Sequence, residues 1–148
     1  MAEKTEINER VRALRTYMQK NGLQAFIFPS TDPHCGEYVP EHWMTRQWIS
    51  GFNGSAGTAV VTLNDAALWT DSRYFLAAAD QLNGTPFCLM KDGLEETPSI
   101  SEWLSSQCSM ANSQQPTANG FTVGMDGWVN TMSNVRCMMD IYAWLKKD

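Results

Sequence analysis

Apolar residues near the start of the chain recur at the spacing of an amphipathic helix. They are Ile7, Val11, Leu14 and Met18. Because Asn21-Gly22 follows them, and such a pair favours the left-handed conformation that ends a helix, the pattern predicts a first helix over residues 8–20. The apolar run AFIF then predicts a strand over residues 24–28, ended by Pro29. A run without polar alternation is typical of an inner strand covered on both faces.

The middle of the chain predicts a β-hairpin that leads into a helix. Two apolar runs, residues 58–63 and 66–70, flank Asn64-Asp65, which is typical of a tight turn. A glycine-rich turn precedes them, because glycine adopts conformations closed to residues with a Cβ. Its glycines are Gly51, Gly54 and Gly57. Asp71 is a competent N-cap for a helix over residues 72–82.

Helices and strands are predicted to alternate along the rest of the chain. The expected helices are residues 42–50, residues 98–106 and a closing helix that begins at Thr131, and the expected strands are residues 87–90 and 121–125. Residues 107–119 are rich in Ser, Gln and Asn and are predicted to form an exposed loop. The closing helix would carry an apolar stripe of Val135, Met138, Met139, Tyr142 and Leu145. This order predicts an α/β fold, a three-layer α/β/α sandwich with helices on both faces of a mixed central sheet.

The composition of the chain limits the number of domains and the kinds of partner that we expect. At 148 residues and 43% hydrophobic content, we expect a single domain over residues 1–148. Eleven basic against sixteen acidic side chains give a net charge of -5 without a basic run, so no nucleic acid is expected as a partner. No stretch reaches the about twenty apolar residues of a membrane span. The charged start MAEKTEINER does not resemble a secretory signal, so we expect no membrane partner and a cytoplasmic location.

The side chains that could bind metal lack the spacing of a metal site. Four cysteines are far apart without a C-x-x-C pair, so we expect reduced, mostly packed thiols. His34, Cys35, Glu37, Glu41 and His42 crowd one short region, but no H-x-x-x-H, H-E-x-x-H or C-x-x-C pattern occurs there. We therefore expect no metal ligand within this chain.

Two further kinds of site are excluded by context. The glycine-rich turn is not a phosphate loop, because Gly57 leads into a strand and no Gly-Lys-Ser/Thr end is present. A tight turn with close backbone packing is the preferred interpretation. No G-x-S-x-G elbow occurs, so the sequence predicts no catalytic residue.

The segment Asp71-Ser72-Arg73-Tyr74 is the best functional candidate. An arginine in the first turn of a helix can direct its guanidinium towards a carboxylate across a domain or subunit boundary. The alternative, which the residues alone favour, is that Arg73 forms a structural ion pair. Tyr38, an aromatic residue with a polar tip between loop prolines, suits the wall of a site or an interface.

Long segments of the chain resemble the amino-terminal domain of aminopeptidase P, the Xaa-Pro aminopeptidases of the creatinase and prolidase superfamily. The most specific segments are SGFNGSAGTAVVT and WTDSRYFLAAADQL, supported by HCGEYVPEHWMTRQW upstream and CLMKDGLEETPSISEWL downstream. The resemblance implies a creatinase-type amino-terminal fold and a substrate-binding role for Arg73, with His34 and Tyr38 as further substrate-binding candidates. It implies interface positions for Glu37 and Arg46. The open alternative for the four residues other than Arg73 is that each is a solvated residue of a loop.

The resemblance also implies an activity whose chemistry lies outside this chain. Enzymes of this family remove the amino-terminal residue that precedes proline, with two metal ions, usually manganese, that activate a bridging water. Their ligands, two aspartates, a histidine and two glutamates, belong to a carboxy-terminal "pita-bread" domain, which residues 1–148 lack. No cofactor is expected in this span.

We therefore expect this chain to be the first domain of a cytoplasmic Xaa-Pro aminopeptidase and to be inactive alone. It would shape the substrate cleft and the contact of a homodimer, and its partners would be its own catalytic domain and peptides with proline at the second position. The alternatives are a non-catalytic peptidase-like module that binds peptides or proteins, and a creatinase or prolidase.

Overall fold

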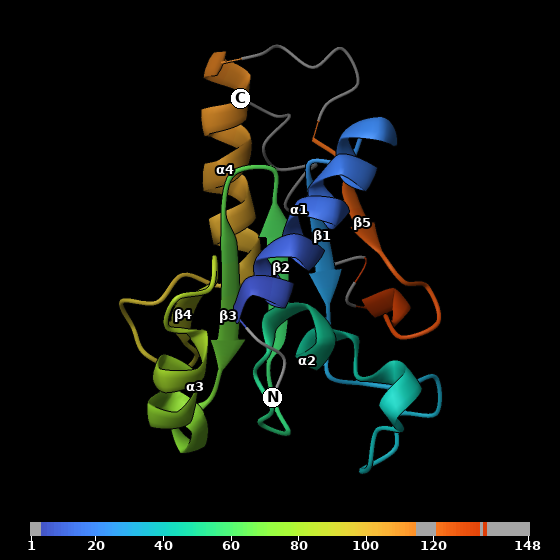
Figure 1. Cartoon of the computed structure of the whole chain (residues 1–148). Coiled ribbons are helices and arrows are strands. Elements are labelled where there is room, and N and C mark those ends of the chain that lie inside the picture. Colours follow the sequence, from blue (N-terminus) through green and yellow to red (C-terminus); the bar gives the residue numbers. More distant parts are fainter. Residues whose placement is uncertain (1–3, 115–120, 134, 136–148) are drawn as a thin grey trace.

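The structure is a computed structural model that describes residues 4–114, 121–133 and 135. A five-stranded mixed sheet lies at its centre, in the order β4-β3-β2-β1-β5 (Figure 1). The strands are β1 (Ala25–Phe28), β2 (Thr58–Thr62), β3 (Ala66–Thr70), β4 (Cys88–Lys91) and β5 (Val123–Met125).

The directions of the strands bring the carboxyl ends of four strands to one edge of the sheet. β2 pairs antiparallel with both β1 and β3, whereas β4 is parallel to β3 and β5 is parallel to β1. Four strands therefore point the same way, and their carboxyl ends meet the start of β2 at the lower edge in Figure 1. Loops at such an edge commonly carry function in α/β folds.

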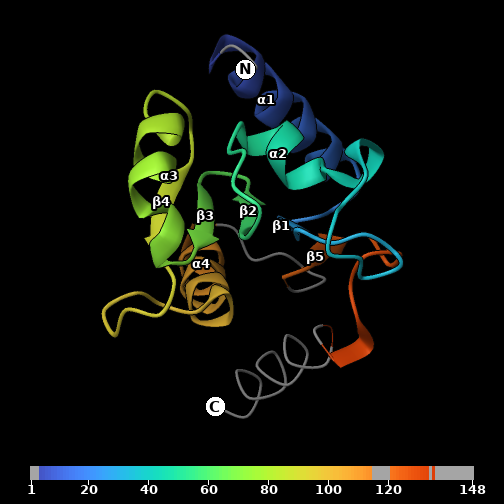
Figure 2. The same ribbon diagram turned by 90° about the horizontal axis from the view of Figure 1, so that it is seen from below.

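Helices cover both faces of the sheet. They are α1 (Lys4–Lys20), α2 (Thr45–Ser50), α3 (Phe75–Leu82) and α4 (Ile100–Gln114), with short 3-10 helices η1 (Glu41–Trp43) and η2 (Ser72–Tyr74). α1, α2 and α3 lie on one face and α4 lies on the other (Figure 2). The predicted three-layer sandwich with a mixed sheet is confirmed.

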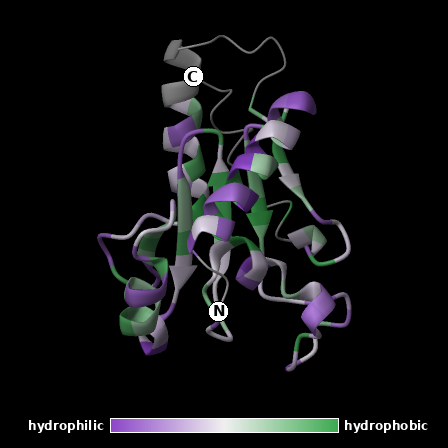
Figure 3. Ribbon diagram, viewed as in Figure 1, coloured by the Kyte–Doolittle hydropathy of each residue, from purple (hydrophilic) through white to green (hydrophobic). Residues whose placement is uncertain are grey.

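Each face of the sheet has its own apolar core. On one face, Ile7 and Val11 of α1 pack in the cluster that includes Val61 and Leu68 of the sheet. On the other face, the Trp103 ring meets the Trp69 ring edge-on, with centroids 5.4 Å apart. Figure 3 shows the apolar residues concentrated on the central strands. The inner strands were recognisable for this reason, because they are buried from both sides.

Several predicted boundaries are wrong. The first helix begins at Lys4 rather than residue 8, which places Ile7 inside it. The expected single helix over residues 42–50 is divided at Met44, whose backbone (φ -76°, ψ 46°) leaves the helical region between η1 and α2. The helix predicted over residues 72–82 is present, but its first turn is the 3-10 helix η2.

The exposed loop predicted over residues 107–119 is wrong for its first eight residues, because α4 continues to Gln114. The serines of α4 are compatible with a helix, because their hydroxyls bond to carbonyl oxygens one turn earlier. Ser105 donates a hydrogen bond to the Ser101 carbonyl oxygen at 2.9 Å, and Ser109 donates to the Ser105 carbonyl oxygen at 3.1 Å. The rest of that predicted loop lies outside the described residues. So does the predicted closing helix after Val135, although Val135 N donates to the Thr131 oxygen at its expected start.

The expectation of mostly packed thiols is also wrong. Cys35 and Cys88 are exposed and Cys108 is intermediate, and none of the three forms a disulfide with another described residue. Cys88 lies on the edge strand β4 and Cys35 in the loop after β1, where few neighbours can cover them. Cys137 lies outside the described residues.

Within the part of the chain that is described, no helix is long and apolar enough to cross a membrane.

Candidate site beside the glycine-rich loop

The glycine-rich loop, residues 51–57, connects α2 to β2 at the edge where the strands end. Gly51 ends α2 in the left-handed conformation (φ 76°), and a Cβ there would lie 2.3 Å from Ile7 Cδ1. Gly57 has φ 154°, and a Cβ there would lie 2.7 Å from the carbonyl oxygen of Trp69. These contacts confirm the interpretation of the glycines as residues of a tight turn with close backbone packing.

Side chains from two helices hold the first half of the loop. The guanidinium of Arg46 in α2 donates to the carbonyl oxygen of Phe52 at 3.0 Å and to that of Gly54. Gln81 of α3 makes two hydrogen bonds with Asn53, each 2.9 Å long: its Oε1 accepts the backbone N–H of Asn53, and its Nε2 donates to Asn53 Oδ1. Two helices distant in sequence thus fix the same turn.

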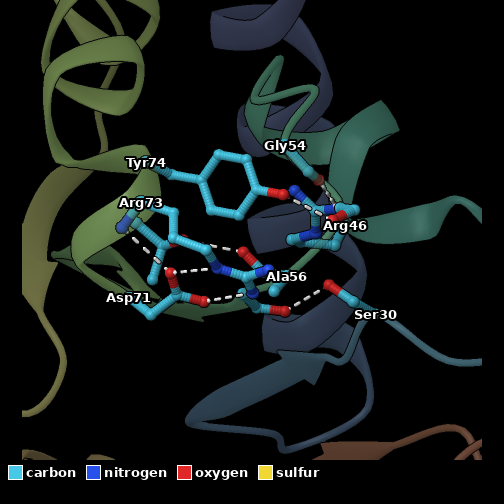
Figure 4. A network of polar contacts seen from close by, with 10 residues as sticks. Ser30, Arg46, Gly54, Ala56, Asp71, Arg73 and Tyr74 are labelled. Carbon is cyan, nitrogen blue, oxygen red and sulfur yellow. Dashed lines mark hydrogen bonds and ion pairs between the residues drawn. The ribbon is translucent and has the colours of Figure 1, made fainter.

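The second half of the loop is held from the sheet and from η2. Thr70 Oγ1 donates to the Ala56 carbonyl oxygen at 2.7 Å, and Ser30 Oγ donates to that of Gly57. The hydroxyls of Ser55 and Tyr74 are hydrogen-bonded at 2.6 Å, and this bond is the largest cause of a lowered pKa of Tyr74. Figure 4 shows how these groups converge on the loop. The loop is therefore a fixed part of the edge.

Arg46 is an internal residue of this network. It is only 6% exposed, and its guanidinium lies 5.0 Å above the Phe52 ring. Burial lowers the pKa of Arg46 to about 10, so the side chain remains charged near neutral pH. The alternative of a solvated loop residue is wrong for Arg46, because it lies on α2 and its hydrogen bonds are internal. Its assignment to an interface stays a prediction.

Arg73 is paired with Asp71 at the start of η2. Arg73 Nε donates to Asp71 Oδ1 at 2.9 Å and Arg73 Nη2 donates to Oδ2 at 2.8 Å. Asp71 Oδ1 also accepts the backbone N–H of Arg73 at 3.0 Å, which confirms the predicted N-cap. The hydrogen bonds from Arg73 lower the pKa of Asp71, and Asp71 raises the pKa of Arg73. The ion-pair interpretation is confirmed, and the substrate-binding role stays a prediction.

A pocket of about 210 Å³ lies beside the glycine-rich loop. It brings together three of the candidate residues, Glu37, Tyr38 and Arg46, with Ser55 of the loop. Tyr38 is 85% exposed, so most of this lining residue is open to solvent. His34 and Arg73 do not line this pocket. We call this space the Arg46 pocket.

Asp32 holds the loop that carries His34 and Tyr38, although it was not among the predicted site residues. Asp32 is 4% exposed, and its Oδ1 atom accepts the backbone N–H groups of His34 at 2.8 Å and Gly36 at 3.1 Å. The signal was present, because aspartate commonly bonds the backbone two residues on in turns. Ser55 and Gln81 were also missed, since their roles depend on contacts distant in sequence.

The described residues do not fit the two manganese ions that the resemblance implies. Within them, no group of three or more His, Cys, Asp or Glu side chains could hold a metal ion. The crowded segment from His34 to His42 runs through a loop into η1, and its side chains form no such group. No step of any reaction is therefore assigned to a metal held by these residues.

Residues 10–140 match the family model described as the creatinase/prolidase N-terminal domain. A probable Xaa-Pro aminopeptidase P from Botryotinia fuckeliana is 41% identical over 134 residues, which is 90% of this chain and 19% of the fungal protein. The chain thus spans about a fifth of the length of that curated relative.

Solved structures share the fold. A cytosolic X-prolyl aminopeptidase with a di-nuclear active site, from Caenorhabditis elegans, has a TM-score of 0.74 and 27% identity, over 99% of this chain and 23% of that one. A creatinase/prolidase-like N-terminal domain from Corynebacterium diphtheriae has a TM-score of 0.58 and 17% identity, over 90% of this chain and 86% of that one. At that identity the second likeness concerns the fold alone.

Proposed function

Because this chain belongs to the creatinase/prolidase N-terminal domain family, we propose that it is the first domain of a Xaa-Pro aminopeptidase, a hydrolase that removes the residue preceding proline. The observation that carries the proposal is the 41% identity to a Xaa-Pro aminopeptidase over 90% of the chain. The fold alone would not suffice, because one fold hosts many activities.

The domain supplies side chains beside chemistry that occurs in another domain. Arg73 is the first candidate for substrate contact, since Asp71 fixes the direction of its exposed guanidinium. His34 and Tyr38 are the further substrate-binding candidates, and Glu37 and Arg46 are the interface candidates. The two metal ions, manganese in this proposal, would be held by the catalytic domain and would activate the attacking water.

The location and the partners belong to the same proposal. The Caenorhabditis elegans structure is described as a cytosolic enzyme, and this supports a cytoplasmic location here. The partners would be the catalytic domain of the same polypeptide, a second copy of the chain and peptides with proline at the second position. A non-catalytic module that binds peptides or proteins is the alternative, and it predicts peptide binding by the longer protein without hydrolysis.

A peptidase assay tests the proposal. The 148-residue chain, supplied with manganese and a peptide with proline at the second position, should show no hydrolysis, whereas a longer protein that contains this chain should release the amino-terminal residue. Turnover by the 148-residue chain would refute its inactivity alone. A longer protein that binds the peptide without cleaving it would favour the non-catalytic alternative.

A further inference from the structure

The Arg46 pocket contains a buried cation whose hydrogen-bonding capacity is not filled. A guanidinium has five N–H donors. Arg46 donates one hydrogen bond from each terminal nitrogen, to the carbonyl oxygens of Phe52 and Gly54. Its Nε atom is buried without a hydrogen-bond partner. Three N–H groups therefore have no acceptor among the described residues.

The charge of Arg46 is also unpaired. The ion pairs of the described residues join Arg10 to Glu6 and Arg73 to Asp71, and neither involves Arg46. Arg46 lines the pocket but is only 6% exposed, so water screens its charge poorly. A buried charge without an opposite charge is unfavourable, and an acceptor with negative charge would relieve this.

The pocket has the size and lining for a small acidic group. Its volume is about 210 Å³, and Pro29, Val39 and Trp43 give it apolar walls. The hydroxyl-bearing residues Ser30 and Ser55 also line it. The acidic residue on its wall, Glu37, is exposed and forms no ion pair with Arg46. A guanidinium at the wall of a small, partly apolar pocket is a common arrangement for recognising a carboxylate.

We propose that the Arg46 pocket binds a carboxylate group, which pairs with the guanidinium of Arg46. The carboxylate is either the terminal group of a short peptide or amino acid, or an aspartate or glutamate side chain of another polypeptide segment. Glu37 lowers the affinity, because its negative charge lies on the same pocket wall. The inference is independent of the proposed peptidase activity, since it depends only on contacts within this chain.

The Nε–H signals of arginine in a ¹H–¹⁵N NMR spectrum test the proposal on the whole 148-residue chain. Sodium acetate should shift the Arg46 signal saturably, with a dissociation constant in the millimolar range. Arg15 is the internal control, because its Nε already donates to the Thr62 carbonyl oxygen at 2.9 Å. Acetamide, which has the same shape without the charge, should leave the Arg46 signal unchanged. An Arg46 signal that ignores acetate, or that shifts equally with sodium chloride, would overturn the proposal.

Variants separate the possible occupants. Glu37→Gln should bind acetate roughly threefold more tightly, because a like charge is removed. Because Trp43 lines the pocket, acetate should also shift its indole N–H signal saturably in the unaltered chain, and Arg46→Lys, checked for folding by circular dichroism, should lose this response. The Glu37→Gln titration remains decisive if Arg46→Lys does not fold. N-acetylglycine represents a chain terminus and N-acetylaspartate methylamide a side chain, so their relative affinities identify the source.

A response in Glu37→Gln but not in the unaltered chain would mean that Glu37 itself pairs with Arg46, and this result would also overturn the proposal. The absence of a response in both proteins rejects the carboxylate site.

Discussion

The carboxylate of Asp71 both caps η2 and binds the guanidinium of Arg73 through two hydrogen bonds. Arg73 Nε lies 2.9 Å from Asp71 Oδ1, and Arg73 Nη2 lies 2.8 Å from Asp71 Oδ2. The side chains of Arg73 and Asp71 are 67% and 38% exposed, so the pair contributes little to stability. Its main consequence is direction, because the two-point contact restricts the orientation of the Arg73 side chain.

Replacement of Asp71 should separate its role as a cap from its role as an ion-pair partner. Asp71→Ala removes both, whereas Asp71→Asn retains an oxygen that can accept the Arg73 N–H. We expect the melting temperature to fall by a few degrees in Asp71→Ala and by less in Asp71→Asn, measured by circular dichroism. Asp80→Ala, an exposed carboxylate on α3, is the matched control. Equal melting temperatures for the two alanine variants would contradict the capping role.

Acidification should erase the contribution of the Asp71 charge. Hydrogen bonds from Arg73 hold the pKa of Asp71 below its ordinary value. A carboxylate with a lowered pKa in the folded state stabilises fully above its unfolded pKa of about 3.9, and this stabilisation is lost as pH falls through the folded pKa. The difference in unfolding free energy between the unaltered chain and Asp71→Asn, measured with urea, should therefore shrink between pH 6 and pH values below the folded pKa. A difference that grows on acidification would contradict this assignment.

The order of elements was predictable where local signals coincide with tertiary packing. The hairpin of β2 and β3 was identified because Asn64-Asp65 separates two apolar runs that are buried on both faces. The cap at Asp71 was predictable because its hydrogen bond is local. The continuation of α4 past Ser106 was not, because polar residues without glycine or proline suit an exposed helix as well as a loop.

The site was less predictable than the fold. Arg73 and Asp71 are two residues apart, so their pairing could be considered from the sequence. The burial of Arg46 could not, because its acceptors lie in the glycine-rich loop, whose conformation depends on Ser30, Thr70 and Gln81 from other elements. Charge is usually a sign of exposure, and a buried arginine with carbonyl partners is an exception to that tendency.

Removal of the Arg46 side chain should destabilise the domain. Arg46→Ala leaves the carbonyl oxygens of Phe52 and Gly54 without their donors and opens a cavity under the glycine-rich loop. The expected loss is about 2–4 kcal/mol of unfolding free energy, measured by urea denaturation. Arg12→Ala, on the exposed side of α1, should change stability little. A loss for Arg46→Ala no larger than that of Arg12→Ala would mean that the network does not hold the loop.

A methyl group at Gly57 should be poorly tolerated. Its Cβ would lie 2.7 Å from the backbone oxygen of Trp69, and φ is 154°, which L-residues rarely adopt. We expect Gly57→Ala to cost about 2–4 kcal/mol of unfolding free energy. Gly127→Ala is the matched control, because no atom lies within 4 Å of the added Cβ. Similar stabilities of the two variants would show that the loop can relax.

We propose that this domain presents Arg73 to a reaction whose catalytic groups lie in another domain. Steady-state hydrolysis of a peptide with proline at the second position, by a longer protein that contains this chain, tests it most directly. Arg73→Ala should lower kcat/KM by about tenfold, with unchanged bound metal and with Arg12→Ala as the control. Unchanged kinetics in Arg73→Ala would contradict the claim.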